Sequence, residues 1–162
     1  MKSGTLRWLL VPLAVVALTV GAWLLWSYRF IVFESDDFSS RLREAACKSS
    51  TNTVALATLT NTNLDWDRVV ILTPYEDRKS LEKALGYSWT GYWPYDDALG
   101  SEGQDVLFFL RDNKIVGVID HPRDAGDFPD AISAKRINRA DAVFRVVSRG
   151  THCDWIGLAV AR

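Results

Sequence analysis

The sequence of 162 residues lacks the motifs of the commonest catalytic and nucleotide-binding sites. It has no G-x-S-x-G, no P-loop and no G-x-G-x-x-G, so the usual signatures of acyl transfer and of nucleotide binding are missing. Histidine is scarce, and His121 and His152 form neither H-x-x-x-H nor H-E-x-x-H, the spacings typical of zinc sites. The sequence therefore predicts no catalytic residue, no cofactor and no metal site.

A basic tract is also missing. Lys2, Arg7 and Arg29 are 3 of the 19 Lys and Arg residues, which leaves 16 basic against 20 acidic side chains from residue 30 onward. Nucleic-acid binding draws much of its affinity from neutralising phosphates, and a mildly acidic domain does not supply that term. We expect no nucleic-acid partner.

What the chain does have is one long apolar run near its amino terminus. Residues 8–26, WLLVPLAVVALTVGAWLLW, carry no charge, and as a helix they would extend about 28 Å, close to the thickness of a bilayer core. Trp8 and Trp26 would lie at the two headgroup regions. The run predicts one transmembrane helix that contacts the lipid bilayer.

The charges on either side of this run predict its orientation. Lys2 and Arg7 precede it, and acidic residues follow, so residues 1–7 are expected in the cytoplasm, 8–28 as a signal anchor and 29–162 in the periplasm. A cleaved signal peptide is the main alternative, because Val20-Gly21-Ala22 matches a small-x-small cleavage pattern. The prediction is a single-pass inner-membrane protein of a Gram-negative bacterium.

The rest of the chain reads as one α+β domain. We expect two short helices, at 36–47 and within 75–85, and a loop or weak edge strand at 48–63. Asp112-Asn113 is a two-residue connection of the kind that makes a tight β-hairpin. β-Branched and aromatic runs predict five strands, at 68–74, 105–111, 114–120, 142–148 and 155–161. The expected architecture is a small antiparallel sheet with both helices on one face.

The only two cysteines, Cys47 and Cys153, lie near the ends of this domain. In an oxidising compartment such a pair predicts a disulfide bond, which would join the helix at 36–47 to the last hairpin. A loop of this length corresponds to about 4.7 kcal/mol in the chain-entropy model. A reactive or metal-binding thiol pair is the alternative, but there is no C-x-x-C motif.

Carboxylates occur in close pairs at 36–37, 65 and 67, and 96–97. Such acids could serve a hydrolase together with His121, using Asp65 or Asp96, but adjacent loop acids are more often a solvated surface. The sequence His121-Pro-Arg-Asp124 likewise reads as a solvated turn.

Aromatic residues concentrate in the segment YSWTGYWPYDD, residues 87–97. Tyr and Trp are enriched at interfaces because they combine rigid apolar area with a hydrogen-bonding group. This segment could bind a protein or a sugar, or its rings could cover the edge of a small core. The candidate partner-binding residues are Trp89, Tyr92, Trp93, Tyr95, Asp96 and Asp97.

The order W-D-x-x-x-I-x-x-P-Y, short helix, L-G, W, then a V-F-x-x-D-x-K-I-V hairpin resembles a group of small bacterial envelope proteins, exported or anchored. The resemblance spans residues 64–89 and the hairpin that follows. It implies fold and compartment and no catalytic residues, with Trp66 and Pro74-Tyr75 as packing residues at strand ends.

These observations favour a membrane-anchored periplasmic module that binds another protein without catalysis. A specific version is an immunity protein or inhibitor of a secreted toxin or hydrolase. The alternative is an accessory subunit of a cell-envelope complex that contacts its partners through the transmembrane helix.

Overall fold

The computed structural model describes residues 18, 19, 21, 35–48, 50–60, 64–89 and 100–161. The chain divides into two units, Met1–Val32 and Phe33–Arg162, and every strand belongs to the second. Nearly all of the predicted transmembrane segment, 8–26, lies outside the described residues. Within the ranges that are described, no helix is both long enough and apolar enough to cross a membrane.

The second unit contains short helices and seven strands among its described residues. The α-helices are α2 (Ser35–Lys48), α3 (Leu56–Leu59) and α4 (Arg78–Leu85). The strands are β1 (Thr53–Ala55), β2 (Arg68–Leu72), β3 (Gln104–Arg111), β4 (Lys114–Pro122), β5 (Arg136–Asn138), β6 (Val143–Arg149) and β7 (Ile156–Val160). Three 3-10 turns complete the unit: η1 (Arg123–Ala125), η2 (Asp130–Ile132) and η3 (Thr151–Cys153).

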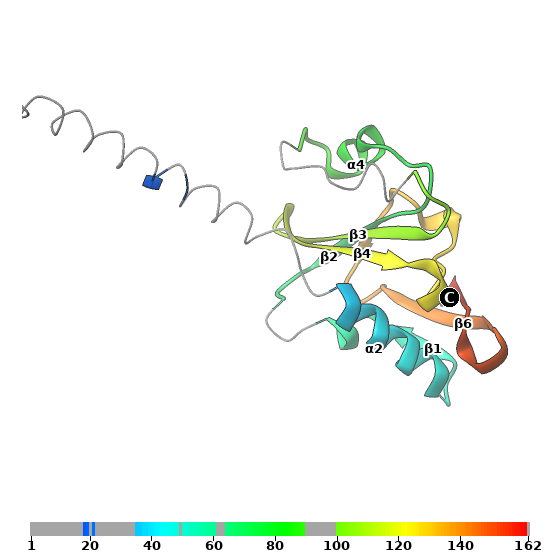
Figure 1. Ribbon diagram of the computed structural model, residues 1–162. Helices are drawn as coiled ribbons and strands as arrows, with labels where there is room; N and C mark the ends of the chain where they lie inside the picture. The colour runs from blue at the N-terminus through cyan, green and yellow to red at the C-terminus, as the bar shows by residue number, and fades with distance from the viewer. Residues whose placement is uncertain are drawn as a thin grey trace, which may run out of the picture. The chain divides into compact units, whose positions relative to one another are not determined.

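The strands form two antiparallel sheets, in the orders β4-β3-β2-β5 and β1-β6-β7 (Figure 1). The α+β class is confirmed, and the prediction of a single sheet is wrong. The reason lies in β3, where the five consecutive residues 106–110 are all fully buried. A strand that is apolar on both sides needs cover on both faces of its sheet, and a single sheet with one-sided cover cannot provide it.

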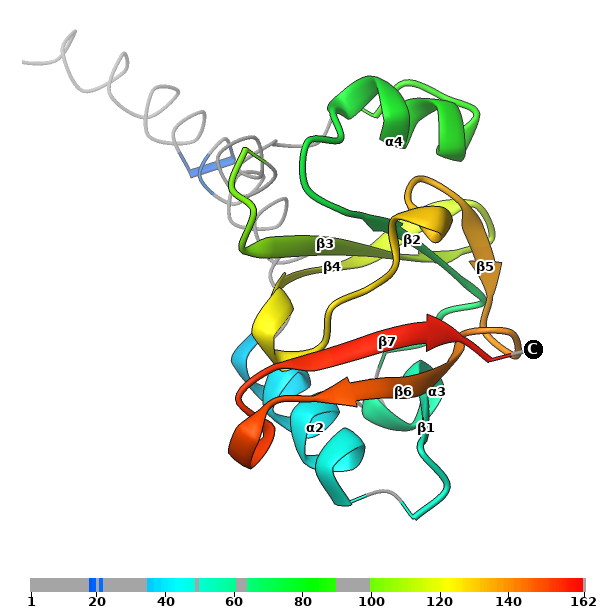
Figure 2. The same ribbon diagram turned by 90° about the vertical axis from the view of Figure 1, so that its right-hand side faces the viewer.

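The two longer helices lie on opposite faces of the four-stranded sheet, α4 on one side and α2 on the other (Figures 1 and 2). The predicted arrangement, with both helices on one face, is therefore wrong. Alternate side chains of the sheet explain the difference. Leu107 and Phe109 of β3 belong to the core cluster that includes α2, whereas Phe108 points to the α4 side, where Trp89 packs on it.

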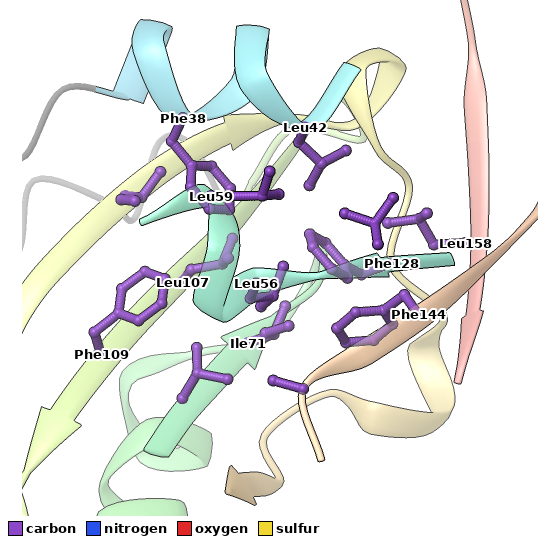
Figure 3. Close-up of a cluster of buried hydrophobic side chains, with 14 of the residues drawn as sticks. Phe38, Leu42, Leu56, Leu59, Ile71, Leu107, Phe109, Phe128, Phe144 and Leu158 are labelled. Carbon is purple, nitrogen blue, oxygen red and sulfur yellow. The ribbon is translucent and has the colours of Figure 1, made fainter. Parts of the chain in front are cut away.

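The main core lies between the two sheets and α2 (Figure 3). It joins apolar residues that are far apart in the sequence. They include Phe38, Leu42, Leu56, Leu59, Ile71, Leu107, Phe109, Phe128, Phe144 and Leu158.

Capping and turn residues predict several element boundaries correctly. The carboxylate of Asp77 accepts a hydrogen bond from Ser80 N at 2.9 Å, and Gly86, at φ 75°, ends α4. Asp112 and Asn113 both have positive φ, as a two-residue hairpin between β3 and β4 requires. The predicted helices and strands are confirmed, and the loop or weak strand at 48–63 contains β1 and α3.

The predicted disulfide between Cys47 and Cys153 is present, with 6.2 Å between the two Cα atoms. It joins the end of α2 to η3, which lies in the connection between β6 and β7. Beside it, the Arg149 guanidinium donates hydrogen bonds of 2.8 and 3.0 Å to the carbonyl of Ala46. The bond therefore fastens α2 to the last hairpin, as the sequence predicts.

Residues 123–128, which we call the strap, connect the two sheets directly. The strap leaves β4, and the amide of Arg123 donates to the carbonyl of Gly103 at 3.0 Å. Farther along, Asp127 N donates to Ile156 O at 2.7 Å and Leu158 N donates to Asp127 O at 3.0 Å. The strap thus begins on the four-stranded sheet and pairs with β7 of the other sheet.

Candidate functional site

Five of the six predicted partner-binding residues lie outside the described part of the chain: Tyr92, Trp93, Tyr95, Asp96 and Asp97. Trp89 is described and is half-buried. Its ring meets the ring of Phe108 edge-on, with centroids 5.8 Å apart. Its amide donates to Glu82 Oε1 at 3.1 Å, and its carbonyl accepts from Arg78. The aromatic segment therefore starts from a tryptophan that packs on the α4 side of the four-stranded sheet.

Tyr87, two residues before Trp89, is also half-buried. Burial raises the pKa of its phenol, while a hydrogen bond from the backbone of Ile115 acts in the opposite direction. Tyr87 and Trp89 together show that the beginning of the aromatic segment contributes to packing.

His121 is fully buried, so its interpretation as part of a solvated turn is wrong. Its Nε2 lies 3.0 Å from the carbonyl oxygen of Gly126, which can only accept, and Nε2 must therefore carry the proton. Its Nδ1 lies 2.8 Å from Ser39 Oγ and accepts from that hydroxyl. Burial lowers the pKa of His121 to about 4, which keeps the imidazole neutral near pH 7.

The pair of Ser39 and His121 resembles a nucleophile with its base, but both side chains are closed off from solvent by neighbouring rings. The imidazole meets the rings of Phe38 and Phe128 edge-on, with centroids 5.7 and 5.6 Å apart. Both groups are therefore buried: His121 has no exposed surface and Ser39 is 5% exposed. The pair binds the strap, because His121 Nε2 donates a hydrogen bond to the backbone carbonyl of Gly126.

The strap approaches α2 so closely at Gly126 that a larger residue would require a neighbouring side chain to move. A Cβ atom at this position would lie 2.3 Å from Leu42 Cδ2 and 3.2 Å from His121 Nε2. The glycine therefore allows the close approach on which the His121 hydrogen bond depends.

Asp105 is the second buried ionisable residue of this region, and none of its surface is exposed. Its Oδ2 accepts from the amide of Phe128 at 3.3 Å, and its Oδ1 accepts no hydrogen bond from the described residues. Arg123 Nε lies 4.0 Å from Oδ1. Burial raises the pKa of Asp105 to about 7, against the Phe128 amide and the charge of Arg123, both of which lower it.

Arg123 forms an ion pair within the strap and a hydrogen bond to the segment that precedes β3. It binds the carboxylate of Asp127 at 2.7 Å and the carbonyl of Glu102 at 2.9 Å. The strap is thus held by charged groups at its surface and by Asp105 and His121 beneath it.

Of the residues of the hydrolase hypothesis, the two that the structure describes, Asp65 and His121, are not brought together. Asp65 is exposed and pairs with Arg111 at 2.9 Å, near the β3-β4 hairpin. His121 lies opposite Asp105, near the other end of the same strand pair. Asp96, the other carboxylate considered, lies outside the described residues. Asp67 accepts from the amide of Asp112 at 3.1 Å and so stabilises the hairpin.

Of the residues that the resemblance assigns to packing, Trp66 fits and Tyr75 does not. Trp66 is buried, donates from Nε1 to Thr60 Oγ1 at 3.0 Å and packs on Phe109. Tyr75 is 70% exposed, with a positive φ of 69°. Its hydroxyl donates to Glu102 at 2.6 Å, and this hydrogen bond raises its pKa.

The three-stranded sheet has one face on the core and one face without cover among the described elements. Val146 and Leu158 point into the core, so their neighbours Arg145 and Ala159, which oppose each other, point outward. Val147, two residues after Arg145 on β6, is 54% exposed, and Trp155, which immediately precedes β7, is 44% exposed. In Figure 2 the strands β6 and β7 lie toward the viewer, with no helix in front of them. We call this surface the open face.

Sequence reasoning missed both the buried pair and the open face. The alternation in VFRVVSR indicates a half-exposed strand, and it could have singled out Val147. Nothing local predicts that Asp105 and His121 are buried. Their burial requires the strap to fold back over β3 and β4, and α2, which is distant in sequence, to pack on His121 through Ser39. No group of His, Cys, Asp and Glu within the described ranges could hold a metal ion.

Comparison with protein-family models, with curated proteins and with solved structures finds no match to this chain. The resemblance to small envelope proteins therefore stays a prediction from its motifs.

Proposed function

We propose that the chain is a membrane-anchored module that binds another protein on the periplasmic side of the inner membrane, without catalysing a reaction. Two features support the location. The uncharged run at 8–26 follows basic residues and is long enough to span a bilayer. The Cys47–Cys153 disulfide is of the kind that persists in oxidising compartments.

The observation that carries the binding role is the open face. Val147 of β6 and Trp155, which precedes β7, expose a large part of their apolar surface. Arg145, two residues before Val147 on β6, is an exposed cation that makes none of the ion pairs between described residues. Trp and Arg are the residue types most enriched among those that dominate protein-protein binding energy. A partner that covers this face would bury the tryptophan and offer a carboxylate to the arginine.

The form that suits these features is an immunity protein or an inhibitor of a secreted toxin or hydrolase. Such a protein needs a rigid, stable surface and no turnover. A disulfide-closed domain of mildly acidic charge meets this requirement.

Site-specific photocrosslinking in intact cells tests the binding role. A photoreactive residue replaces Trp155 on the open face or Trp93 in the aromatic segment, and Lys83, exposed on α4, is the matched control position. We expect a discrete crosslinked species from position 155 or 93 and none from position 83. Absence of a specific species at both test positions would contradict the proposal.

A chimera then separates this proposal from the accessory-subunit alternative. Residues 8–26 are replaced by an unrelated transmembrane helix of the same length, and the crosslinked species is measured again. If binding belongs to the periplasmic domain, the crosslink persists. Its loss would favour a role in which the helix contacts the partner.

A further inference from the structure

Two ionisable residues hold the strap from below, and they face each other on neighbouring strands. Asp105 of β3 pairs in register with His121 of β4. Asp105 accepts from the amide of Phe128, and His121 donates to the carbonyl of Gly126. Between these two contacts lies Asp127, whose backbone pairs with β7 of the other sheet. The joint between the sheets therefore depends on both residues.

We propose that the strap is a proton-compensated clasp, in which Asp105 and His121 respond to pH in opposite directions, so that the joint between the two sheets keeps its stability through mild acid. This inference uses only the described residues and does not depend on the proposed function.

The groups around Asp105 favour and oppose its charge in nearly equal number. Arg123 of η1 and the amide of Phe128 favour the carboxylate, whereas Asp127 and Asp130 disfavour it. Full burial, with Oδ1 accepting no hydrogen bond from the described residues, disfavours it most. Asp105 is therefore most stable in the folded chain when it is protonated.

The groups around His121 leave it neutral. Ser39 donates to Nδ1, so protonation of Nδ1 to form the imidazolium would break this hydrogen bond. Asp124 favours the imidazolium and Arg43 disfavours it, and these two side chains bind each other at 2.7 Å. The rings of Phe38 and Phe128 supply no compensating charge.

Whether each residue stabilises the fold more or less as the pH changes follows from the linkage between protonation and folding. His121 has a pKa of about 4 in the folded chain against 6.5 ordinarily, so its contribution is lost as the pH falls from 6.5 to 4. Asp105 has a pKa of about 7 against 3.8, so its contribution is lost as the pH rises over nearly the same range. Together the two slopes cancel between about pH 4 and 6.5.

Two substitutions that remove the titrating group but keep a hydrogen-bonding group separate the two pH dependences, in the full-length chain purified in detergent. Asp105→Asn keeps an acceptor for Phe128, and His121→Gln keeps a donor for Gly126. Urea unfolding is measured from pH 4 to 8, with Asp65→Asn on the exposed surface as the control. Relative to wild type, we expect the unfolding equilibrium constant of Asp105→Asn to fall about tenfold per pH unit between pH 4 and 6.5. With increasing pH over the same range, the unfolding equilibrium constant of His121→Gln rises about tenfold per pH unit relative to wild type. The pH profile of Asp65→Asn is parallel to that of wild type.

Hydrogen exchange of the Asp127 and Leu158 amides, which form the joint to β7, locates the effect. Their protection factors change with pH in opposite directions in the two variants, and more than those of β2 amides. Profiles parallel to wild type in both variants would overturn the proposal.

Nuclear magnetic resonance of the wild-type protein keeps the proposal testable if a variant does not fold. The Asp105 carboxyl and the His121 ring are followed through the same pH range. We expect a protonated carboxyl and a neutral imidazole at pH 5.5. An ionised carboxylate beside an imidazolium at that pH would overturn the proposal, because the clasp would then be an ion pair.

Discussion

The two sheets are built from different sequence patterns and meet the solvent differently. In the four-stranded sheet, β3 is buried over 106–110 and its sheet is covered on both faces. In the three-stranded sheet, β6 alternates buried and exposed residues, and one face is open. An uninterrupted apolar strand requires cover on two sides, and an alternating strand requires it on one.

This difference assigns separate tasks to the two regions. The four-stranded sheet supplies most of the stability, because its side chains contribute to two buried layers. The three-stranded sheet closes the core with one face and leaves the other for a partner. Substitutions in each region test this division.

Removal of a ring from the four-stranded sheet has the largest effect. Phe109 is fully buried between Phe38 and Trp66, with ring centroids 6.3 and 5.0 Å away. We expect Phe109→Ala to lower the free energy of unfolding by about 3 to 5 kcal/mol. Urea denaturation measures the loss, and Val147→Ala on the open face is the control. Equal losses in the two variants would refute the division between the sheets.

Loss of the disulfide removes the covalent link between α2 and the connection from β6 to β7. The double variant Cys47→Ser with Cys153→Ser should lose about 2 to 5 kcal/mol, because the unfolded chain regains the freedom of a long loop. Thermal unfolding with and without reductant measures this. Reductant should destabilise the wild type and leave the double variant unchanged. A wild type that reductant does not affect would contradict the prediction.

The close approach of the strap to α2 makes Gly126 sensitive to one added methyl group. We expect Gly126→Ala to cost about 1 to 3 kcal/mol through its clash with Leu42. Gly103→Ala is the control, since the nearest atom to its Cβ lies 4.0 Å away. Adding Leu42→Ala should make the combined loss smaller than the sum of the two single losses, as double-mutant analysis of unfolding will show. Strict additivity would mean that the clash is absent.

The open face gives the smallest effect on folding. Trp155→Ala should change the free energy of unfolding by less than about 0.5 kcal/mol, as is usual at exposed positions. The same substitution, made in a chain that carries the photoreactive residue at position 93, should lower the yield of the crosslinked species. Calorimetry and crosslinking yield measure the two quantities on one protein. A large drop in the melting temperature would show that the ring belongs to the core.

Much of the fold could be predicted from local patterns. Asp77 and Gly86 mark the ends of α4, and Asp112-Asn113 marks the hairpin, because capping and turn geometry depend on residues close in sequence. The Cys47–Cys153 bond followed from the count of cysteines and the expected compartment.

The arrangement of strands and the buried pair could not be predicted in the same way. Whether β6 pairs with β5 or with β1 depends on contacts across about 90 residues, which no local signal reports. His121 looks like a turn residue beside Pro122, and only the strap and α2, through Gly126 and Ser39, bury it. Its environment is a property of the tertiary structure.

The bond between Cys47 and Cys153 also has a mechanical consequence. It closes a covalent ring, so a force applied at either end of the domain can extend only the residues outside that ring. An unfoldase that pulls from the amino-terminal side would unwind α2 as far as Cys47. One that pulls from the carboxyl end would first detach β7 from its sheet. The 105 residues between the two cysteines would be shielded from traction until the bond is reduced.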